Sequence, residues 1–398
     1  MVKSDTAAPQ SGQLRVELLI VGGGIMGLWA ALHAERQGID TLLVDEGPLA
    51  RGASGGLLGA LMPHMPDRWS EKKQFQFDAL IGLEEEVGRM EAETGLSAGY
   101  RRSGRLIPLP KPHLRVIAER HCKDAETHWH HGARSFSWTP LDASPAGTDW
   151  PSEEFMAAGI VYDTFAARVS PRSLTAMLTA RLNEALHVRI IENSGVALLH
   201  PETHIARLSD GRTVAFGHCI IAAGHRSFPM LESLGAPLPL PLGQPVKGQA
   251  ALLKADIDPA LPLLYLDGLY IVPHEGGYAA IGSTSEDRFD DPGSTDEQLE
   301  ELIGRARGLA PALRDAEVVE RWAGLRPKAI DRDPMVGPHP DHPRIHALTG
   351  GFKVSFGLAH RLAEAAVAGI AGRLENDANG LPQSFTLHHH IVIAARNA

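Results

Sequence analysis

The stretch that decides the fold is VELLIVGGGIMGLWAALHAERQG, residues 16–38. It begins with a short run of branched and apolar side chains, residues 16–21, which is typical of a buried parallel strand. Glycines follow directly, and from Ile25 the sequence takes a helical pattern that Gly38 ends in the usual position after a helix. Because residues 41–44, TLLV, read as a second buried strand, the stretch predicts a strand, a glycine turn, a helix and a strand in succession.

The glycines between the first strand and the helix form a complete G-x-G-x-x-G, with Gly22, Gly24 and Gly27 at its fixed positions. Glycines let the backbone approach a pyrophosphate, and the helix amino end supplies N–H donors and a positive dipole. Asp45 follows the second strand at the distance expected of an acid that binds ribose hydroxyls. The pattern predicts dinucleotide binding; the alternative is a glycine turn without a ligand, and the motif does not separate NAD from FAD.

Composition excludes several classes of protein. With 398 residues, 43% of them hydrophobic, the chain can bury a large core and form two compact units. Lys plus Arg number 38 against 48 Asp plus Glu, a net charge of -10, which gives no attractive field for nucleic acid. The two cysteines, Cys122 and Cys219, lie far apart and predict neither a disulfide framework nor a thiolate zinc site, which fits a reducing cytoplasm.

The amino-terminal sequence predicts neither export nor a membrane span. Residues 1–13, MVKSDTAAPQSGQ, are polar and lack the apolar centre of a secretory signal. The longest uncharged stretch nearby, residues 18–32, is interrupted by glycines and too short to cross about 30 Å of hydrocarbon. We expect a soluble cytoplasmic protein; attachment to a membrane surface stays open, and no pattern predicts an oligomeric state.

A glycine-rich loop follows the second strand, GPLARGASGGLLGAL over residues 47–61, where a NAD-linked domain would move on to its next crossover. Here the chain resembles the FAD-dependent family of D-amino acid oxidases, glycine oxidases and monomeric sarcosine oxidases, in which such a loop runs under the flavin. The resemblance extends from about residue 14 to about residue 372. Its later segments arrive in the family's order: VSPRSL (169–174), GV (195–196), CIIAAGHRS (219–227), VKGQ (246–249), YIVP (270–273), IGST (281–284), WAGLRP (322–327) and TGGFKVSFG (349–357).

The resemblance implies an α/β fold: a Rossmann-like FAD-binding domain with an inserted α+β substrate domain built on a mostly antiparallel sheet. Residues 249–253, 264–273 and 278–281 read as strands broken by glycine and proline, in agreement with such a sheet. The predicted ranges are 14–95, 160–235 and 322–375 for the FAD domain, 96–159 and 236–321 for the substrate domain, and 1–13 and 376–398 for the tails.

The implied cofactor is FAD, held without a covalent bond, because the position of the flavin-linked cysteine of the sarcosine oxidase branch is Gly324 here. No metal is predicted: the histidines at 128, 130 and 131 and at 388–390 lack the helical spacing with a carboxylate that zinc sites use, and read as solvated surface. The predicted cofactor-binding residues are Gly22, Gly24, Ile25, Met26, Gly27, Asp45, Glu46, Ser54, Gly59, Ala60, Val196, Ala223, Gly224, Gly351, Phe352, Lys353, Val354 and Ser355.

Three residues are candidates for binding or orienting the substrate. Arg326 matches the arginine that anchors carboxylates in the glycine oxidase branch, and its planar guanidinium suits a bidentate bond; the alternative is a bond to nearby Asp331 or Asp333. Lys353 matches a basic residue near the reactive edge of the flavin, and otherwise is a solvated loop lysine. Tyr270 matches a substrate-contacting tyrosine, and otherwise is a half-buried strand residue.

The resemblance implies an enzyme that oxidises the C–N bond of a small amino acid or secondary amine of the glycine, sarcosine or D-amino acid type. Hydride passes to flavin N5, the imine becomes an oxo acid, and O₂ takes the electrons. One alternative is a dehydrogenase of the same fold that passes electrons to a quinone or a partner subunit. A tRNA-modifying flavoprotein and a non-catalytic flavin-binding partner are alternatives of another class. Residues 52–56 also match the G-x-S-x-G of serine hydrolases, but the preceding strand has already ended at Asp45.

Overall fold

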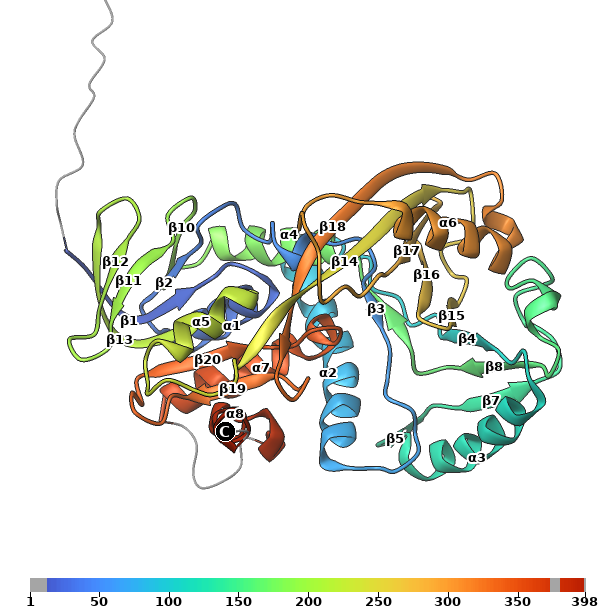
Figure 1. The fold of residues 1–398 in the computed structure, drawn as a ribbon, viewed down its shortest axis with the longest axis horizontal. Helices are drawn as coiled ribbons and strands as arrows, with labels where there is room; N and C mark the ends of the chain where they lie inside the picture. Colours follow the sequence, from blue (N-terminus) through green and yellow to red (C-terminus); the bar gives the residue numbers. More distant parts are fainter. Residues whose placement is uncertain (1–12, 373–379, 397–398) are drawn as a thin grey trace, which may run out of the picture.

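The computed structural model describes residues 13–372 and 380–396, which form two eight-stranded sheets with helices packed on them and two small two-stranded sheets (Figure 1). The opening unit has the predicted order, with β1 (Gln13–Val21), α1 (Ile25–Gln37) and β2 (Thr41–Val44). Gly38 ends α1 in the left-handed conformation at φ 70°, and its N–H donates to the carbonyls of Ala34 and Glu35. The pattern of residues 16–44 is therefore confirmed.

The first sheet has a parallel centre. β10, β2, β1 and β13 are parallel neighbours, and β20 pairs in parallel with the last residues of β13. β12 pairs antiparallel with the first residues of β13, and β11 and β19 complete the sheet. The bounds of these strands are Val188–Ile191 (β10), Val196–His200 (β11), Ile205–Leu208 (β12), Thr213–Ile221 (β13), Met335–Pro338 (β19) and Ile345–Thr349 (β20).

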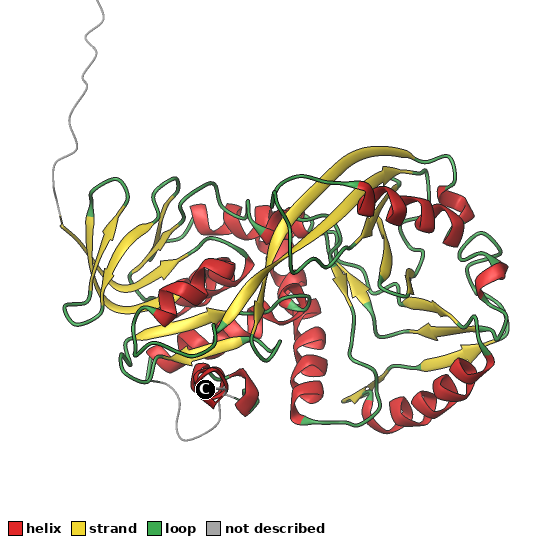
Figure 2. Ribbon diagram, viewed as in Figure 1, coloured by secondary structure: helices red, strands yellow, loops and turns green. Residues whose placement is uncertain are grey.

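Helices cover both faces of this sheet because its central strands are apolar on both sides. Leu18 and Ile20 of β1 pack in a core with α1, α2, α4 and α7, whereas Leu19 and Val21 pack in a second core with α5 and α8. Figure 2 shows these helices around the sheet. Their bounds are Glu71–Thr94 (α2), Pro171–Asn183 (α4), Ser227–Glu232 (α5), Ser355–Ile370 (α7) and Leu387–Arg396 (α8).

The second sheet has the order β18-β14-β17-β16-β15-β4-β8-β7, and all neighbours are antiparallel except β15 and β4. The mostly antiparallel sheet is thus confirmed. Its helices are α3 (Pro112–His128), which packs on β7, and α6 (Glu297–Leu309). The strand bounds are Arg105–Pro108 (β4), Trp138–Leu141 (β7), Ile160–Asp163 (β8), Gly243–Lys254 (β14), Leu263–Leu266 (β15), Leu269–His274 (β16), Tyr278–Gly282 (β17) and Glu317–Ala329 (β18).

Alternation along the strands gives this sheet two different faces. Leu253, Ile271 and Ile281 pack under α6, whereas Ala250 and Val272 belong to the small cluster on the opposite face, which contains Leu57 of the glycine-rich loop. The pair β14 and β18 is bonded along its whole length and runs from this sheet to the helices of the first (Figure 1). The second sheet therefore turns one face toward the strand ends of the first.

Two of the predicted domain boundaries do not coincide with the limits of the observed sheets. The boundaries at residues 160 and 322 assign β8 and most of β18 to the FAD half, but β8 pairs with β4 and β7, and β18 pairs with β14. Both strands belong to the second sheet by hydrogen bonding. A short apolar strand does not reveal its neighbour, since pairing depends on partners far away in sequence.

The predicted carboxy-terminal tail is wrong for residues 380–396, which end in helix α8 with Leu387 and Ala394 in the core. His390 is fully buried and bonds the carbonyl of Pro334 at 3.1 Å, and His389 bonds Asp331 at 2.9 Å, so only His388 of the triplet is solvated. In the other triplet, His128 stacks on Trp69 while His130 and His131 are exposed. Residues 1–12, 373–379 and 397–398 lie outside the described residues.

The remaining elements are short. They are β3 (Ala60–Leu61) paired with β9 (Ala167–Arg168), β5 (His130–His131) paired with β6 (Arg134–Ser135), and single helical turns at Ala53–Gly55, Glu153–Phe155, Gly224–Arg226, Pro311–Leu313 and Gln383–Phe385. Within the described ranges, no helix combines the length and the hydropathy needed to cross a bilayer.

Candidate active site

A cavity of about 1040 Å³ lies between the two sheets. Small-molecule pockets typically measure roughly 300–1,000 Å³, so this one can hold a large ligand. It is lined by the carboxyl ends of β1, β2 and β13, by the segment after β20 and by the inner face of the second sheet. Ligands of open α/β sheets bind outside the carboxyl ends of the strands, and this is where the cavity is placed.

The glycines of the G-x-G-x-x-G keep the turn and the helix close together. Gly22 has φ 104°, and a Cβ there would lie 2.5 Å from the carbonyl oxygen of Ala222. A Cβ on Gly27 would lie 1.9 Å from the carbonyl oxygen of Gly22, so only glycine lets α1 pack so near the first turn. Gly22 and Gly24 line the cavity, whereas Gly27 lies behind them.

Asp45 uses both carboxylate oxygens to brace this end of the cavity. Oδ2 accepts the N–H of Gly23 at 2.7 Å, and Oδ1 accepts the N–H of Gly47 at 2.9 Å. Each oxygen keeps a second lone pair, so a hydroxyl can still donate to it. Glu46, the next lining residue, pairs with Arg226.

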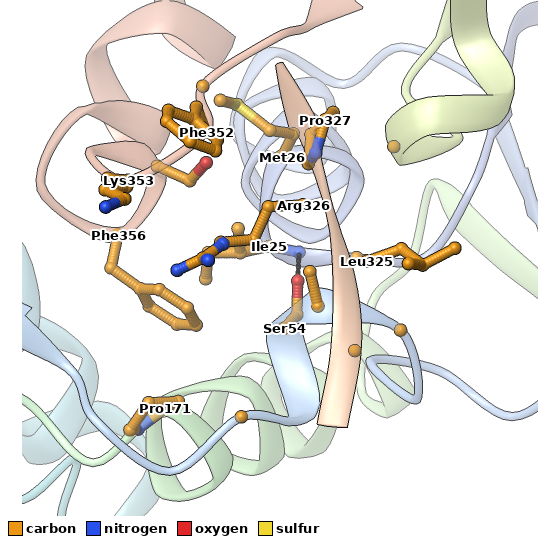
Figure 3. A pocket seen from close by; sticks show the side chains of 18 of the residues that line it. Ile25, Met26, Ser54, Pro171, Leu325, Arg326, Pro327, Phe352, Lys353 and Phe356 are labelled. Carbon is orange, nitrogen blue, oxygen red and sulfur yellow. Dashed lines mark hydrogen bonds between the residues drawn. The ribbon is translucent and has the colours of Figure 1, made fainter. Parts of the chain in front are cut away.

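Ser54 joins the glycine-rich loop to the helix. Its Oγ accepts the N–H of Ile25, the first residue of α1, at 2.9 Å, and the side chain is buried (Figure 3). One orphan donor of the helix start is thereby satisfied. Ser54 lies in a single helical turn, Ala53–Gly55, and not in a strand-to-helix elbow.

The segment before α7 lines another part of the cavity. Gly350 has φ 75°, and a Cβ on Gly351 would lie 2.5 Å from Ser355 Oγ and 2.7 Å from Met26 Cε. Ser355 and Phe356, at the start of α7, have no earlier helical carbonyl for their N–H groups, whereas Gly357 donates to the carbonyl of Val354 at 3.1 Å. The helix dipole is positive at this end. This is a suitable place for a ligand atom that gains negative charge.

Apart from Gly27, every predicted cofactor-binding residue lines the cavity, and so do Arg326, Lys353 and Tyr270. The backbone at β1 and β2 fits a dinucleotide because Gly22 and Gly24 border the cavity without side chains, while Gly27 keeps α1 close to the turn. Their individual contacts with the cofactor stay a prediction. Neither cysteine is among the described lining residues: Cys219 is buried in β13, where burial raises the pKa of its thiol, and Cys122 lies on α3. A non-covalent flavin agrees with this placement.

Arg326 extends from β18 into the cavity on the side where Lys353 and Phe356 lie, opposite to Leu325 (Figure 3). Its Nη1 donates to Ser283 Oγ at 2.8 Å and its Nη2 to the carbonyl of Thr284 at 2.5 Å. Nε has no partner among the described residues, although it is buried. Burial lowers the pKa of Arg326 to about 10, so the side chain is charged at neutral pH.

The alternative role of Arg326 is not observed. Asp331 bonds His389 and Asp333 pairs with Lys72, so neither aspartate holds the guanidinium. A Cβ on Gly248 would lie 2.5 Å from Nη2 of Arg326, which shows that the neighbouring strand leaves room for this arginine. The guanidinium is therefore held in place by its bonds to Ser283 and Thr284 and by the space beside Gly248.

Lys353 and Tyr270 lie at the same cavity. Lys353 is exposed in the cavity-lining segment before α7, and its Nζ is 5.6 Å from the centre of the Phe352 ring. Partial desolvation, together with the charges of Arg326 and Arg332, lowers its pKa. The Tyr270 ring is 4.8 Å from that of Tyr265, and burial raises the pKa of its phenol.

Sequence reasoning missed Tyr265, His64, Trp322 and Arg105, which also line the cavity. Burial lowers the pKa of His64 to about 4, so this imidazole is neutral at pH 7. Tyr265 could have been found, because Asp267 and Gly268 form a two-residue hairpin turn that sets residue 265 opposite Tyr270. Nothing in the local sequence points to Arg105.

The chain is similar to known proteins over most of its length. The family model described as FAD dependent oxidoreductase, DAO, matches residues 17–365. A glycine oxidase of Pseudomonas aeruginosa is 29% identical over 351 residues, covering 86% of this chain and 91% of the relative. A glycine oxidase of Geobacillus kaustophilus is 27% identical over 395 residues, covering 94% and 97%.

Solved structures share the fold at lower sequence identity. Glycine oxidase from Geobacillus kaustophilus superposes with a TM-score of 0.80 at 23% identity, covering 94% of this chain and 99% of the other. Iminodiacetate oxidase from Chelativorans sp. BNC1 also gives a TM-score of 0.80, at 20% identity, covering 93% and 98%.

Proposed function

Since the chain belongs to the DAO family of FAD-dependent oxidoreductases, we propose that it oxidises the C–N bond of a small amino acid or secondary amine and passes the electrons to O₂. Glycine oxidases among the curated relatives, which it matches over nearly the whole chain, support this substrate type and this acceptor. The cofactor is FAD, and it would supply the hydride acceptor of the reaction.

The observation that carries the proposal is Arg326. A half-buried guanidinium whose buried Nε has no partner among the described residues, at the wall of the cavity, is suited to hold a carboxylate. Ser283 and Thr284 fix its orientation through the bonds to Nη1 and Nη2. A carboxylate held this way fixes the neighbouring carbon, and orientation of a reacting C–H lowers a barrier by several kcal/mol.

Tyr270 and Lys353 complete the proposed substrate end. The Tyr270 hydroxyl donates to the substrate carboxylate and its ring walls the pocket, while the Lys353 charge adds to the positive potential. We assign no protein general base. Desolvation in the cavity lowers the pKa of a bound ammonium group, so the substrate amine can release its extra proton to solvent water as it binds.

The test is an anaerobic titration of the yellow protein, followed by its visible absorbance. Glycine, sarcosine, D-amino acids and D- or L-proline are added in turn, and the acid that bleaches the flavin identifies the substrate type. Rapid return of colour in air supports O₂ as acceptor, whereas slow return that a quinone accelerates favours a dehydrogenase. A flavin that no amine bleaches contradicts the proposed function.

A further inference from the structure

A second arginine lines the same cavity as Arg326. Arg105, the first residue of β4, is 3% exposed and pairs with Asp163 at the end of β8, which is 0% exposed. The distance from Nη2 to Asp163 Oδ2 is 2.6 Å. Asp163 is itself fixed, because its Oδ1 accepts the N–H groups of Phe165 at 2.7 Å and of Ala166 at 3.2 Å.

The pair is oriented with its positive end toward the cavity. Arg105 is a lining residue and Asp163 is not, so the carboxylate lies behind the guanidinium. Nη1 has only Met62 Sδ, a weak acceptor, at 3.2 Å, and Nε has no partner in the described part of the chain. A buried donor without an acceptor costs free energy, which a ligand that accepts the hydrogen bond would recover.

An arginine with a purely structural role has a different pattern nearby. Arg102 bonds Glu84 through Nε and Nη2, the carbonyl of Phe165 through Nη1 and the hydroxyl of Tyr100 through Nη2. All three nitrogens are used, and Arg102 does not line the cavity. An Nε without a partner is not peculiar to Arg105, since Arg168 and Arg307 have one too. Arg105 differs from Arg168 in two respects: its Nη1 has only a sulfur acceptor, and it lines the cavity.

The carboxylates around the cavity lie at one end, where Arg51 and Arg226 also line it and Arg226 pairs with Glu46. Among the described lining residues the carboxylates are Asp45 and Glu46, which follow β2 at the dinucleotide end. Arg105, Arg326 and Lys353 line the remaining part. Burial raises the pKa of the Tyr270 phenol, and the charges of both arginines oppose this effect.

We propose that the substrate carries two carboxylates, one held by Arg326 and the second held by Arg105 beside the facing pair Tyr265 and Tyr270. This rests on the proposed function and narrows its substrate class. The second carboxylate belongs either to the side chain of the amino acid or to the substituent on its nitrogen. A substrate with one carboxylate leaves the free donors of Arg105 unsatisfied and binds less well.

Binding is tested on the FAD-loaded enzyme with two acids that do not react, succinate and butyrate, by titration calorimetry. They have the same carbon chain and differ in one terminal carboxylate. We expect succinate to bind about tenfold to a hundredfold more tightly, as for a charge-assisted hydrogen bond. The double variant Arg105→Met/Asp163→Asn removes both charges without leaving a buried ion alone, and should bring the ratio near one. The control Arg102→Met/Glu84→Gln should keep it.

Kinetics separates the two positions of the second carboxylate. If kcat/KM is higher for iminodiacetate than for sarcosine, the second carboxylate lies on the nitrogen substituent. If it is higher for D-aspartate than for D-alanine, the second carboxylate lies on the side chain. Either result supports the proposal. Equal binding of succinate and butyrate, or a preference that survives in Arg105→Met/Asp163→Asn, overturns it. If no amine bleaches the flavin, the proposed function fails, while the succinate-to-butyrate ratio still decides the role of Arg105.

Discussion

At the scale of single residues, Arg326 shows how the chain keeps a charge inside a cavity. Ser283 and Thr284 accept from its Nη atoms, the Phe352 ring lies 5.4 Å from its guanidinium carbon, and Gly248 leaves the space. Nε remains for a ligand. A lysine would keep the charge but not the planar fork that matches a carboxylate.

Arg326→Leu should therefore lower kcat/KM for amino acid substrates by about 10²–10³, as expected when a charged hydrogen-bond donor is lost from a buried site. Arg326→Lys should recover only part of the loss. Steady-state kinetics gives these values, and the flavin-to-protein absorbance ratio shows whether the cofactor is retained. The matched control is Arg321→Leu, an exposed residue of the same strand paired with Glu300, which should change little. Equal losses in both variants would contradict the assignment.

The sequence contained a signal for some residues of the site and none for others. Arg326 was found because the segment WAGLRP resembles a family motif. Tyr265 was available from the hairpin turn that follows it. Arg105 was not available, because its partner Asp163 and its place at the cavity depend on the pairing of β4 with β8 and β15, which local sequence does not encode.

At the scale of elements, the turn between β1 and α1 depends on close contact between backbones. In Gly27→Ala, the methyl group would clash with the carbonyl of Gly22. The helix start would shift, and FAD should be largely lost on dilution, with destabilisation of about 1–3 kcal/mol as for an overpacked core site. Flavin fluorescence in the filtrate of the diluted protein measures the loss. Gly88→Ala is the control, since a Cβ there meets nothing within 4 Å in α2, and it should retain the flavin.

The unit β1–α1–β2 was predictable because the cues for each element lie within it: branched residues, glycines and a helix stop. α8 was missed although Leu387, His390, Ile391 and Ala394 have helical spacing. The histidine triplet hid this pattern, because histidine was treated as polar surface.

Leu387→Ala should lower the free energy of unfolding by about 2–4 kcal/mol, since the side chain is 1% exposed and lies in the core with Met335. Urea unfolding followed by tryptophan fluorescence gives the value. His388→Ala, on the exposed side of the same helix, should be within about 0.5 kcal/mol of the parent chain. A harmless Leu387→Ala would mean that α8 does not pack on the sheet in solution.

At the scale of the whole molecule, buried histidines make stability depend on pH. Burial lowers the pKa of His274 and His346 to about 4 and that of His360 to about 3. A histidine in the unfolded chain titrates near pH 6.5. Below that pH the unfolded chain binds protons at these three histidines, whereas in the folded chain the same side chains stay neutral. Stability is full above pH 6.5 and is lost as the pH falls toward 4, with a limiting slope of about 1.4 kcal/mol per pH unit for each histidine.

His274→Gln should flatten this dependence, because it removes one group that titrates differently in the two states, while a glutamine can still donate to the carbonyls of Leu57 and Leu58. The measurement is the urea midpoint at pH 4.5, 5.5, 6.5 and 7.5. His388→Gln, at an exposed site, should leave the profile unchanged. An unaltered profile in His274→Gln would contradict the role of burial.

The cavity is closed by residues as distant in the chain as Val21 and Gly357. Synthesis proceeds from the amino terminus, so β1, α1 and β2 leave the ribosome long before β20 and α7 exist to complete the pocket. At that stage the nascent chain contains the glycine turn that binds the cofactor, but not the segments that complete the walls of the cavity. We therefore expect FAD to bind only after α7 has been synthesised, and a chain truncated before α7 should purify without flavin absorbance.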